Sequence, residues 1–208
     1  SRDETVQLLC KSKLPGVTFS YPDTFIFSKI KELTGPRGYP GGQEKGKGDK
    51  IPLNIFLSQE LQRMNRIIGL VKKTFSDIIE AVDGQIIMTP QIVDAIDALY
   101  DRRVPKSWLY DLAGTEISWL KPNFSLWFQS FNDRNLKLDD WIKGNRPKFF
   151  NLDNYFNPNG FLTSMKQEVV RIRKANQKGK AGLQENWSMD AVDYKVDVLE
   201  KNKDMKDF

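Results

Sequence analysis

The sequence predicts an all-α protein, an irregular multi-helix bundle with one long central helix and one short β-strand near the C-terminus. Apolar residues recur at alternating steps of three and four, the spacing of one helix face, in most segments of the chain. Prolines and N-cap residues open these segments, and glycines or prolines follow their ends. Strict alternation with period two occurs in a single stretch, residues 192–198.

Residues 1–34 are predicted to form two short helices. The first covers residues 3–14 and ends at Pro15-Gly16, and the second begins after Pro22 with Asp23 as its N-cap. The buried side of the second helix is predicted to hold Phe25, Ile26, Ile30 and Leu33. Residues 35–50 are rich in glycine, proline and charge, which predicts a flexible loop.

The central helix is predicted to run from Pro52 to Gly84. Proline suits a first helical turn, and glycine suits the position after the last, where a positive φ is needed. At ~1.5 Å per residue such a helix is about 45 Å long. Its apolar stripe consists of Leu57, Leu61, Met64, Ile68, Val71, Phe75, Ile78 and Val82.

This stripe is interpreted as core, and no chemistry is assigned to it. Three isoleucines widen it, which predicts packing against several neighbours rather than a two-stranded coiled coil: Ile55, Ile67 and Ile79. The polar residues of the helix are predicted to lie on the remaining surface: Gln59, Glu60, Arg63, Lys72, Lys73 and Asp77.

Three more helices are predicted after the central helix. Thr89-Pro90 reads as an N-cap and first-turn proline, and opens a helix that ends near residues 101–103. The stretch after it is loop-rich, and its large aromatics are predicted to fill gaps between helices. Asn123 is predicted to cap a long helix that stops at Gly144, and Asn157-Pro158 to open the last one.

The amino-acid composition argues against several classes of catalytic and metal site. Without histidine the sequence lacks the commonest proton shuttle, the usual base of a serine or cysteine nucleophile, and a usual zinc ligand. Carboxylates remain, but Asp139 and Asp140 are predicted to face water. The single cysteine, Cys10, is expected to be a buried, inert thiol in a cytosolic setting. We therefore expect no catalytic, cofactor-binding or metal-binding residue.

No membrane partner is expected either. No apolar run approaches the roughly 20 residues that cross a bilayer, and no charged and then apolar leader opens the sequence.

One motif imitates a nucleotide site. Gly41, Gly46 and Lys47 have the spacing of a phosphate-binding GxxxxGK loop, but Gly48 stands where serine or threonine would bind magnesium. A working phosphate loop also leaves a buried strand and opens directly into a helix, whereas residues 49–52 intervene here. The motif is therefore interpreted as part of the loop, and ATP is not expected to bind it.

Two further stretches are alternatives for partner binding. Residues 171–180 are strongly basic, but they lack the interleaved aromatics that single-stranded nucleic-acid binders use, so a solvated helix end is favoured. Trp108 and Trp119 are interpreted as gap-filling residues, with an exposed aromatic groove for a peptide as the alternative. The formal charge of +5 allows an acidic partner without requiring one.

Residues 192–198 alternate like a half-buried strand, with Val192, Tyr194, Val196 and Val198 on one face. A lone strand cannot satisfy its backbone groups. We therefore expect the chain to be a fragment that stops inside, or just before, a sheet.

Several residue strings resemble the C-terminal region of the dynein heavy chain family. They are PLNIFLSQELQRMN at 52–65, AVDG at 81–84, IIM at 86–88, Val104-Pro105 with Trp108, GNRP at 144–147, and YFNPNGFLTSMKQEV at 155–169. They follow the family's order over most of residues 1–200 and resemble axonemal heavy chains more than cytoplasmic ones. The loops at 35–50 and 179–186 look longer than is usual in the family.

The resemblance implies a non-catalytic helical segment that follows the sixth AAA module of an ATP-driven microtubule motor and lies on the AAA ring. Residues 1–34 would adjoin that module, 35–50 would form a loop, 51–185 the helical part, and 186–208 the start of a truncated β-rich subdomain. ATP and magnesium belong to earlier modules of the family.

The partners implied are the AAA ring of the same polypeptide and, through the parent motor, microtubules and the intermediate and light chains. The implied location is cytoskeletal, in the axoneme of a cilium or flagellum. The alternatives are a free-standing helical interaction module and, less favoured, a basic nucleic-acid-binding domain.

Overall fold

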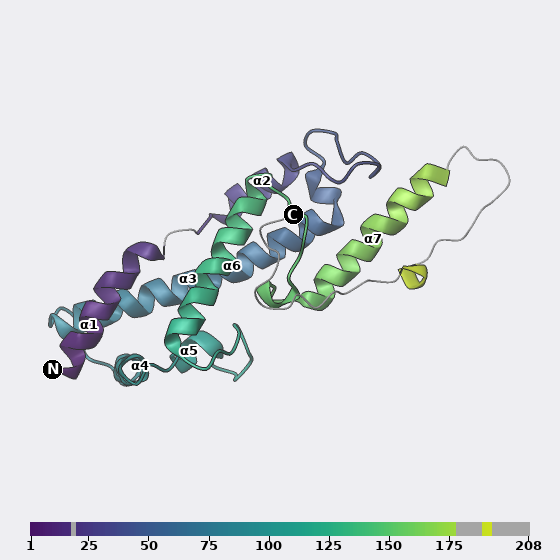
Figure 1. Cartoon of the computed structure of the whole chain (residues 1–208). Helices are drawn as coiled ribbons and strands as arrows, with labels where there is room; N and C mark the ends of the chain where they lie inside the picture. The colour runs from purple at the N-terminus through teal and green to yellow at the C-terminus, as the bar shows by residue number, and fades with distance from the viewer. Residues whose placement is uncertain (18–19, 178–188, 193–208) are drawn as a thin grey trace, which may run out of the picture.

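The computed structural model describes residues 1–17, 20–177 and 189–192 (Figure 1). These residues form helices with no strand, apart from an isolated bridge between Tyr110 and Glu116. The predicted all-α bundle is therefore confirmed for this part of the protein. Of the predicted strand at 192–198, all but Val192 lies outside the described residues. The α-helices are α1 (Arg2–Lys13), α2 (Asp23–Glu32), α3 (Pro52–Val82), α4 (Pro90–Tyr100), α5 (Lys106–Leu109), α6 (Phe124–Ile142) and α7 (Pro158–Gln177).

Four short 3-10 helices lie between or beyond them: η1 (Leu14–Gly16), η2 (Gly48–Lys50), η3 (Leu152–Asn154) and η4 (Met189–Ala191). Within the described ranges, no helix has both the length and the apolar character that crossing a bilayer requires.

The long helix α3 organises the bundle (Figure 1). It packs against α1 and α4 near its C-terminal end and against α2 and α7 near its N-terminal end, while α6 lies across it. Gly84, with φ of +73°, follows α3 as predicted, and the Gln85 N–H donates to the Glu80 carbonyl at 2.8 Å. This left-handed residue lets the last carbonyls of the helix find donors.

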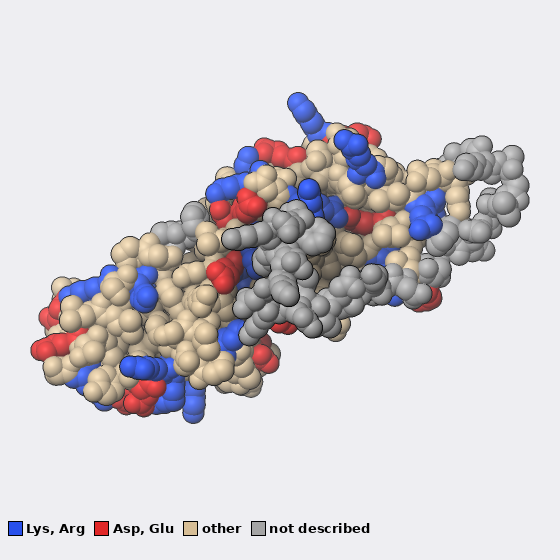
Figure 2. All heavy atoms as spheres, in the orientation of Figure 1, with Lys and Arg blue, Asp and Glu red and all other residues tan. Residues whose placement is uncertain are grey.

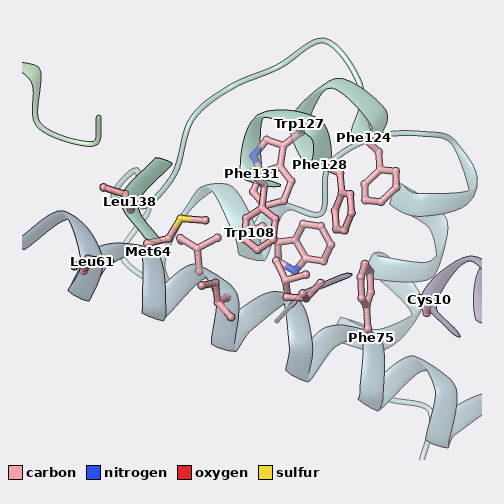
Figure 3. Packing of buried hydrophobic residues seen from close by; sticks show 14 of the residues in the cluster. Cys10, Leu61, Met64, Phe75, Trp108, Phe124, Trp127, Phe128, Phe131 and Leu138 are labelled. Carbon is pink, nitrogen blue, oxygen red and sulfur yellow. The ribbon is translucent and has the colours of Figure 1, made fainter. Parts of the chain in front are cut away.

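Aromatic side chains from α5 and α6 fill the space beside α3 (Figure 3). The ring of Trp108 lies 5.5 Å from that of Phe75 and 5.1 Å from that of Trp127. The indole N–H of the fully buried Trp108 donates to the Thr74 hydroxyl at 2.9 Å. Trp108 therefore fills a gap between helices, as predicted, with its one polar atom paired.

Three local predictions are wrong. Ile55 is exposed, because it lies two positions from Leu53 and Leu57 and therefore on the opposite side of α3. Phe25 is also exposed, since its neighbour Ile26 faces the core. Asp23 is the first residue of α2 rather than its N-cap, a position held by Pro22 without a side-chain hydrogen bond. By contrast, Thr89 and Asn123 cap their helices as predicted.

Replacing Trp108 with alanine is expected to lower the free energy of unfolding by about 3–5 kcal/mol, because it opens a cavity in the core. Urea denaturation followed by circular dichroism measures this change. The control is Leu136→Ala, because Leu136 is an exposed residue of α6. Its effect is expected to stay within about 0.5 kcal/mol, and equal effects of the two substitutions would contradict the assignment of Trp108 to the core.

Candidate functional site: reciprocal carboxylate caps between α3 and α7

Two buried glutamates join α3 to α7. Glu60 on α3 is 0% exposed and Glu168 on α7 is 3% exposed. Each carboxylate accepts hydrogen bonds from backbone groups at the start of the other helix. Carboxylates are rarely buried, because ionised oxygens removed from water need donors in the protein. We call this pair the reciprocal caps.

Glu60 binds the backbone that leads into α7. Its two oxygens accept the N–H groups of Phe156 and Asn157 at 2.7 and 3.1 Å. The Asn157 side chain then accepts the Gly160 N–H at 3.0 Å, and Pro158 has no N–H to satisfy. Three backbone donors at this helix start therefore bond to two side chains.

Glu168 performs the equivalent role for α3. Its Oε1 accepts the Leu53 N–H at 3.1 Å, and its Oε2 pairs with Arg146 at 2.6 Å. The N-cap residue of α3 is Ile51, which has no side-chain acceptor for a hydrogen bond. A carboxylate from another helix thus replaces the missing cap, and its charge lies at the positive end of the α3 dipole.

Arg134 connects α6 to this polar interior. It is buried, and its guanidinium donates to the Asp153 carbonyl and to the Ser130 hydroxyl. The same group lies 4.1 Å from the centre of the Trp119 ring, within the range of a cation–π interaction. The charge of Arg134 partly compensates that of Glu60.

Burial controls the protonation of these groups. It raises the pKa of Glu60 above its ordinary value of 4.5, although the Phe156 and Asn157 N–H groups and the charges of Arg63 and Arg134 act in the opposite direction. Burial also lowers the pKa of Arg134 to about 10, despite the nearby carboxylate. In each case removal from water penalises the charged form.

The geometry suits positioning of helices rather than acid–base chemistry. Both oxygens of Glu60 are occupied by backbone donors and neither is open to solvent. A cleft of about 370 Å³ lies elsewhere, between α2 and the end of α6, where Phe25 and Trp141 line it. Within the described residues, no three His, Cys, Asp or Glu side chains are grouped to hold a metal ion.

The glycine motif is arranged as a succession of turns. The Glu44 N–H donates to the Gly41 carbonyl at 3.1 Å, and η2 separates the motif from α3. A phosphate loop would direct the first N–H groups of the following helix at its ligand. Here the Leu53 N–H at that position already binds Glu168.

The two tryptophans do not form an exposed groove. Trp108 is fully buried, and Trp119 is half-buried and stacks on Trp127 with ring centres 5.1 Å apart.

The basic run at 171–180 begins with Arg171, which donates to the Tyr39 hydroxyl at 2.5 Å. Residues 178–180 of this run lie outside the described residues.

Two of the buried carboxylates were predicted to face water, and both predictions are wrong. Glu60 is fully buried, and Asp139 is buried where it accepts from the Tyr21 hydroxyl and from Lys143 at 2.6 Å. A signal for Glu60 exists, because it lies three residues after Leu57 and four before Met64, inside the apolar stripe. A lone carboxylate on such a face requires donors from another element.

Fold and site together define a helical scaffold segment in which buried charges fix the positions of helices. Residues 2–207 match the family described as the C-terminal domain of the dynein heavy chain, and this protein belongs to that family. The resemblance seen in the sequence, including its axonemal character, is thereby confirmed.

Relatives from distant organisms agree. The chain is 36% identical to dynein axonemal heavy chain 8 of Homo sapiens over 152 residues, 73% of this chain and 3% of that protein. It is 40% identical to dynein axonemal heavy chain 5 of Mus musculus over 123 residues, 59% of this chain and 2% of that protein. Identity to the flagellar outer arm dynein gamma chain of Chlamydomonas reinhardtii is 30% over 206 residues, 99% of this chain and 4% of that protein. The chain thus spans only a few per cent of these relatives.

Removing a reciprocal cap is expected to destabilise the fold. Glu60→Ala should lower the free energy of unfolding by about 3 kcal/mol, because the Phe156 and Asn157 N–H groups would remain buried without an acceptor. Urea denaturation measures the loss. Gln59→Ala is the control, since Gln59 is the more accessible neighbour on α3. A loss no larger than that of the control would show that the cap contributes nothing.

The raised pKa of Glu60 predicts a pH dependence with a definite sign. The folded state binds this proton more readily than the unfolded state, so the stability contributed by Glu60 is fully present below its ordinary pKa of 4.5. That contribution is lost as pH rises through the raised folded value. The free energy of unfolding of the wild type minus that of Glu60→Gln should therefore fall as pH rises above 4.5 and then level off. A difference that grows with pH would contradict the assignment.

Proposed function

We propose that this chain is a non-catalytic structural and regulatory segment of an axonemal dynein heavy chain, and that it docks on the AAA ring of the same polypeptide. Family membership over residues 2–207 carries the proposal. ATP and magnesium act in the AAA modules of the parent, which moves on microtubules and carries intermediate and light chains. The parent works in the axoneme of a cilium or flagellum.

Apolar side chains left in water support docking. Ile87 and Leu112 are 84% and 109% exposed, although the inner faces of the helices are buried. Ile87 lies between the exposed residues Ile86 and Met88 in the link from α3 to α4, so three consecutive apolar residues are accessible there. Covering such residues with another apolar surface is favourable.

A docked segment regulates the ring only by binding its conformations unequally. A contact of equal strength with every ring state shifts no population. The reciprocal caps matter here because they fix α7 on α3. A ring movement that displaces one of these helices therefore acts on the other.

ATP added to the isolated chain is expected to give neither saturable binding nor turnover, because its glycine motif is not built as a phosphate loop. In the full-length heavy chain, Ile87→Glu is expected to weaken docking and change the ATPase rate. Hydrogen exchange of the α3–α4 link measures docking, and phosphate release measures the rate. Gln85→Glu, an exposed neighbour, is the control.

Saturable ATP turnover by the isolated chain would overturn the non-catalytic assignment. Identical exchange and rates for the Ile87→Glu and Gln85→Glu proteins would overturn docking through this link.

A further inference from the structure

The loop between α2 and α3 lies on the C-terminal part of α7. Tyr39, near its middle, is buried, and its hydroxyl accepts from Arg171 at 2.5 Å and donates to the Lys50 carbonyl at 3.2 Å. A Cβ atom built on Gly38 would lie 3.4 Å from the Ile172 side chain, so the backbone itself packs against α7.

The C-terminal end of the loop, at Gly48, packs closely against α2 and the residue that follows it. Gly48 is buried, and a Cβ atom there would lie 2.0 Å from the Ile30 carbonyl and 2.4 Å from that of Leu33. Any larger residue would push the loop off α2. The Asn54 amide also donates to the Gly48 carbonyl at 3.1 Å. Tertiary contacts thus fix the loop in place, and its surface adjoins that of α7.

This surface is strongly positive. We call it the basic face, and it consists of the exposed residues Arg37, Lys45, Lys47, Lys50, Arg171, Arg173 and Lys174. Within residues 35–50 and 171–177 the carboxylates are Glu44 and Asp49, which gives a net charge of +5. The formal charge of the whole chain is also +5, so the remaining residues are balanced. Lysine and arginine side chains lie over the loop and the end of α7 in the upper right of Figure 2.

We propose that the basic face binds an acidic protein segment rich in aspartate or glutamate. The proposal is independent of docking through the α3–α4 link, because it rests on the other end of α3. A face of this charge attracts and orients an acidic surface over several ångströms.

Nucleic acid fits the basic face less well. Tyr39 is the only aromatic residue of the two segments, and it is buried, so no ring is exposed for base stacking.

The contact is expected to be sensitive to salt. Each exposed ion pair contributes little and is screened at physiological ionic strength. Binding therefore needs several cations at once, and reversing two of them should be enough to weaken it.

Zero-length carbodiimide coupling tests the proposal in the full-length protein within its native assembly. Lys45, Lys47, Lys50 and Lys174 are expected to couple to aspartate or glutamate outside residues 1–208, and mass spectrometry identifies the acidic segment. The yield should fall when salt is raised from about 50 mM to about 500 mM. Lys106 and Lys121, exposed lysines outside the basic face, are the reference positions.

Charge reversal gives the matched comparison. Lys45→Glu with Lys50→Glu is expected to lower coupling at Lys47 and Lys174 about fivefold, whereas Lys106→Glu with Lys121→Glu, the same change in charge, should leave it unaltered. The proposal is overturned if Lys47 and Lys174 couple only to Glu44 and Asp49, the carboxylates of the loop at 35–50. It is also overturned if the reference lysines couple equally, or if nuclease abolishes the coupling and so identifies nucleic acid as the partner.

Discussion

This bundle depends on hydrogen bonds that the backbone N–H groups at the starts of α3 and α7 make to side chains of other helices. The first N–H groups of an α-helix have no partner within the helix. In α3 the N-cap is an isoleucine, and in α7 the preceding backbone is partly buried, so each start requires an acceptor from elsewhere. Glu168 and Glu60 supply these acceptors reciprocally. Neither helix can therefore be fully satisfied unless both are in place, which couples segments 115 residues apart in sequence.

The sequence predicted those features whose residues lie within one segment, and it missed those that depend on contacts between distant segments. The bounds of α3 depend on Pro52, Gly84 and an apolar stripe, which are all visible within one segment, and the helix was predicted to within two residues of its C-terminal end. The burial of Glu60 depends on donors 96 residues away, which its place in the apolar stripe does not reveal, and the predicted surface placement was wrong. The predicted exposure of Asp139 was wrong for the same reason, because its hydrogen-bond donor Tyr21 lies 118 residues from it.

The loop at 35–50 illustrates a different limit of sequence reasoning. Glycine, proline and charge predict a loop without saying where it lies, and its flexibility stays a prediction. The contacts of Tyr39 with Arg171 and of Gly48 with α2 arise from tertiary packing. Gly48, which stands where a phosphate loop would place serine or threonine, is needed here because backbone must approach backbone closely. Packing against α2 thus explains the glycine at position 48, while the absence of ATP binding stays a prediction.

The exposed apolar link of residues 86–88 and the basic face lie at opposite ends of α3. The apolar link of residues 86–88 follows its C-terminal end, and the basic face is attached to its N-terminal end. A helix of 31 residues is about 46 Å long at ~1.5 Å per residue, so the two surfaces can meet different neighbours. The reciprocal caps join α7 to α3 at the end that carries the basic face, so a partner on that face would contact two helices that these caps hold together.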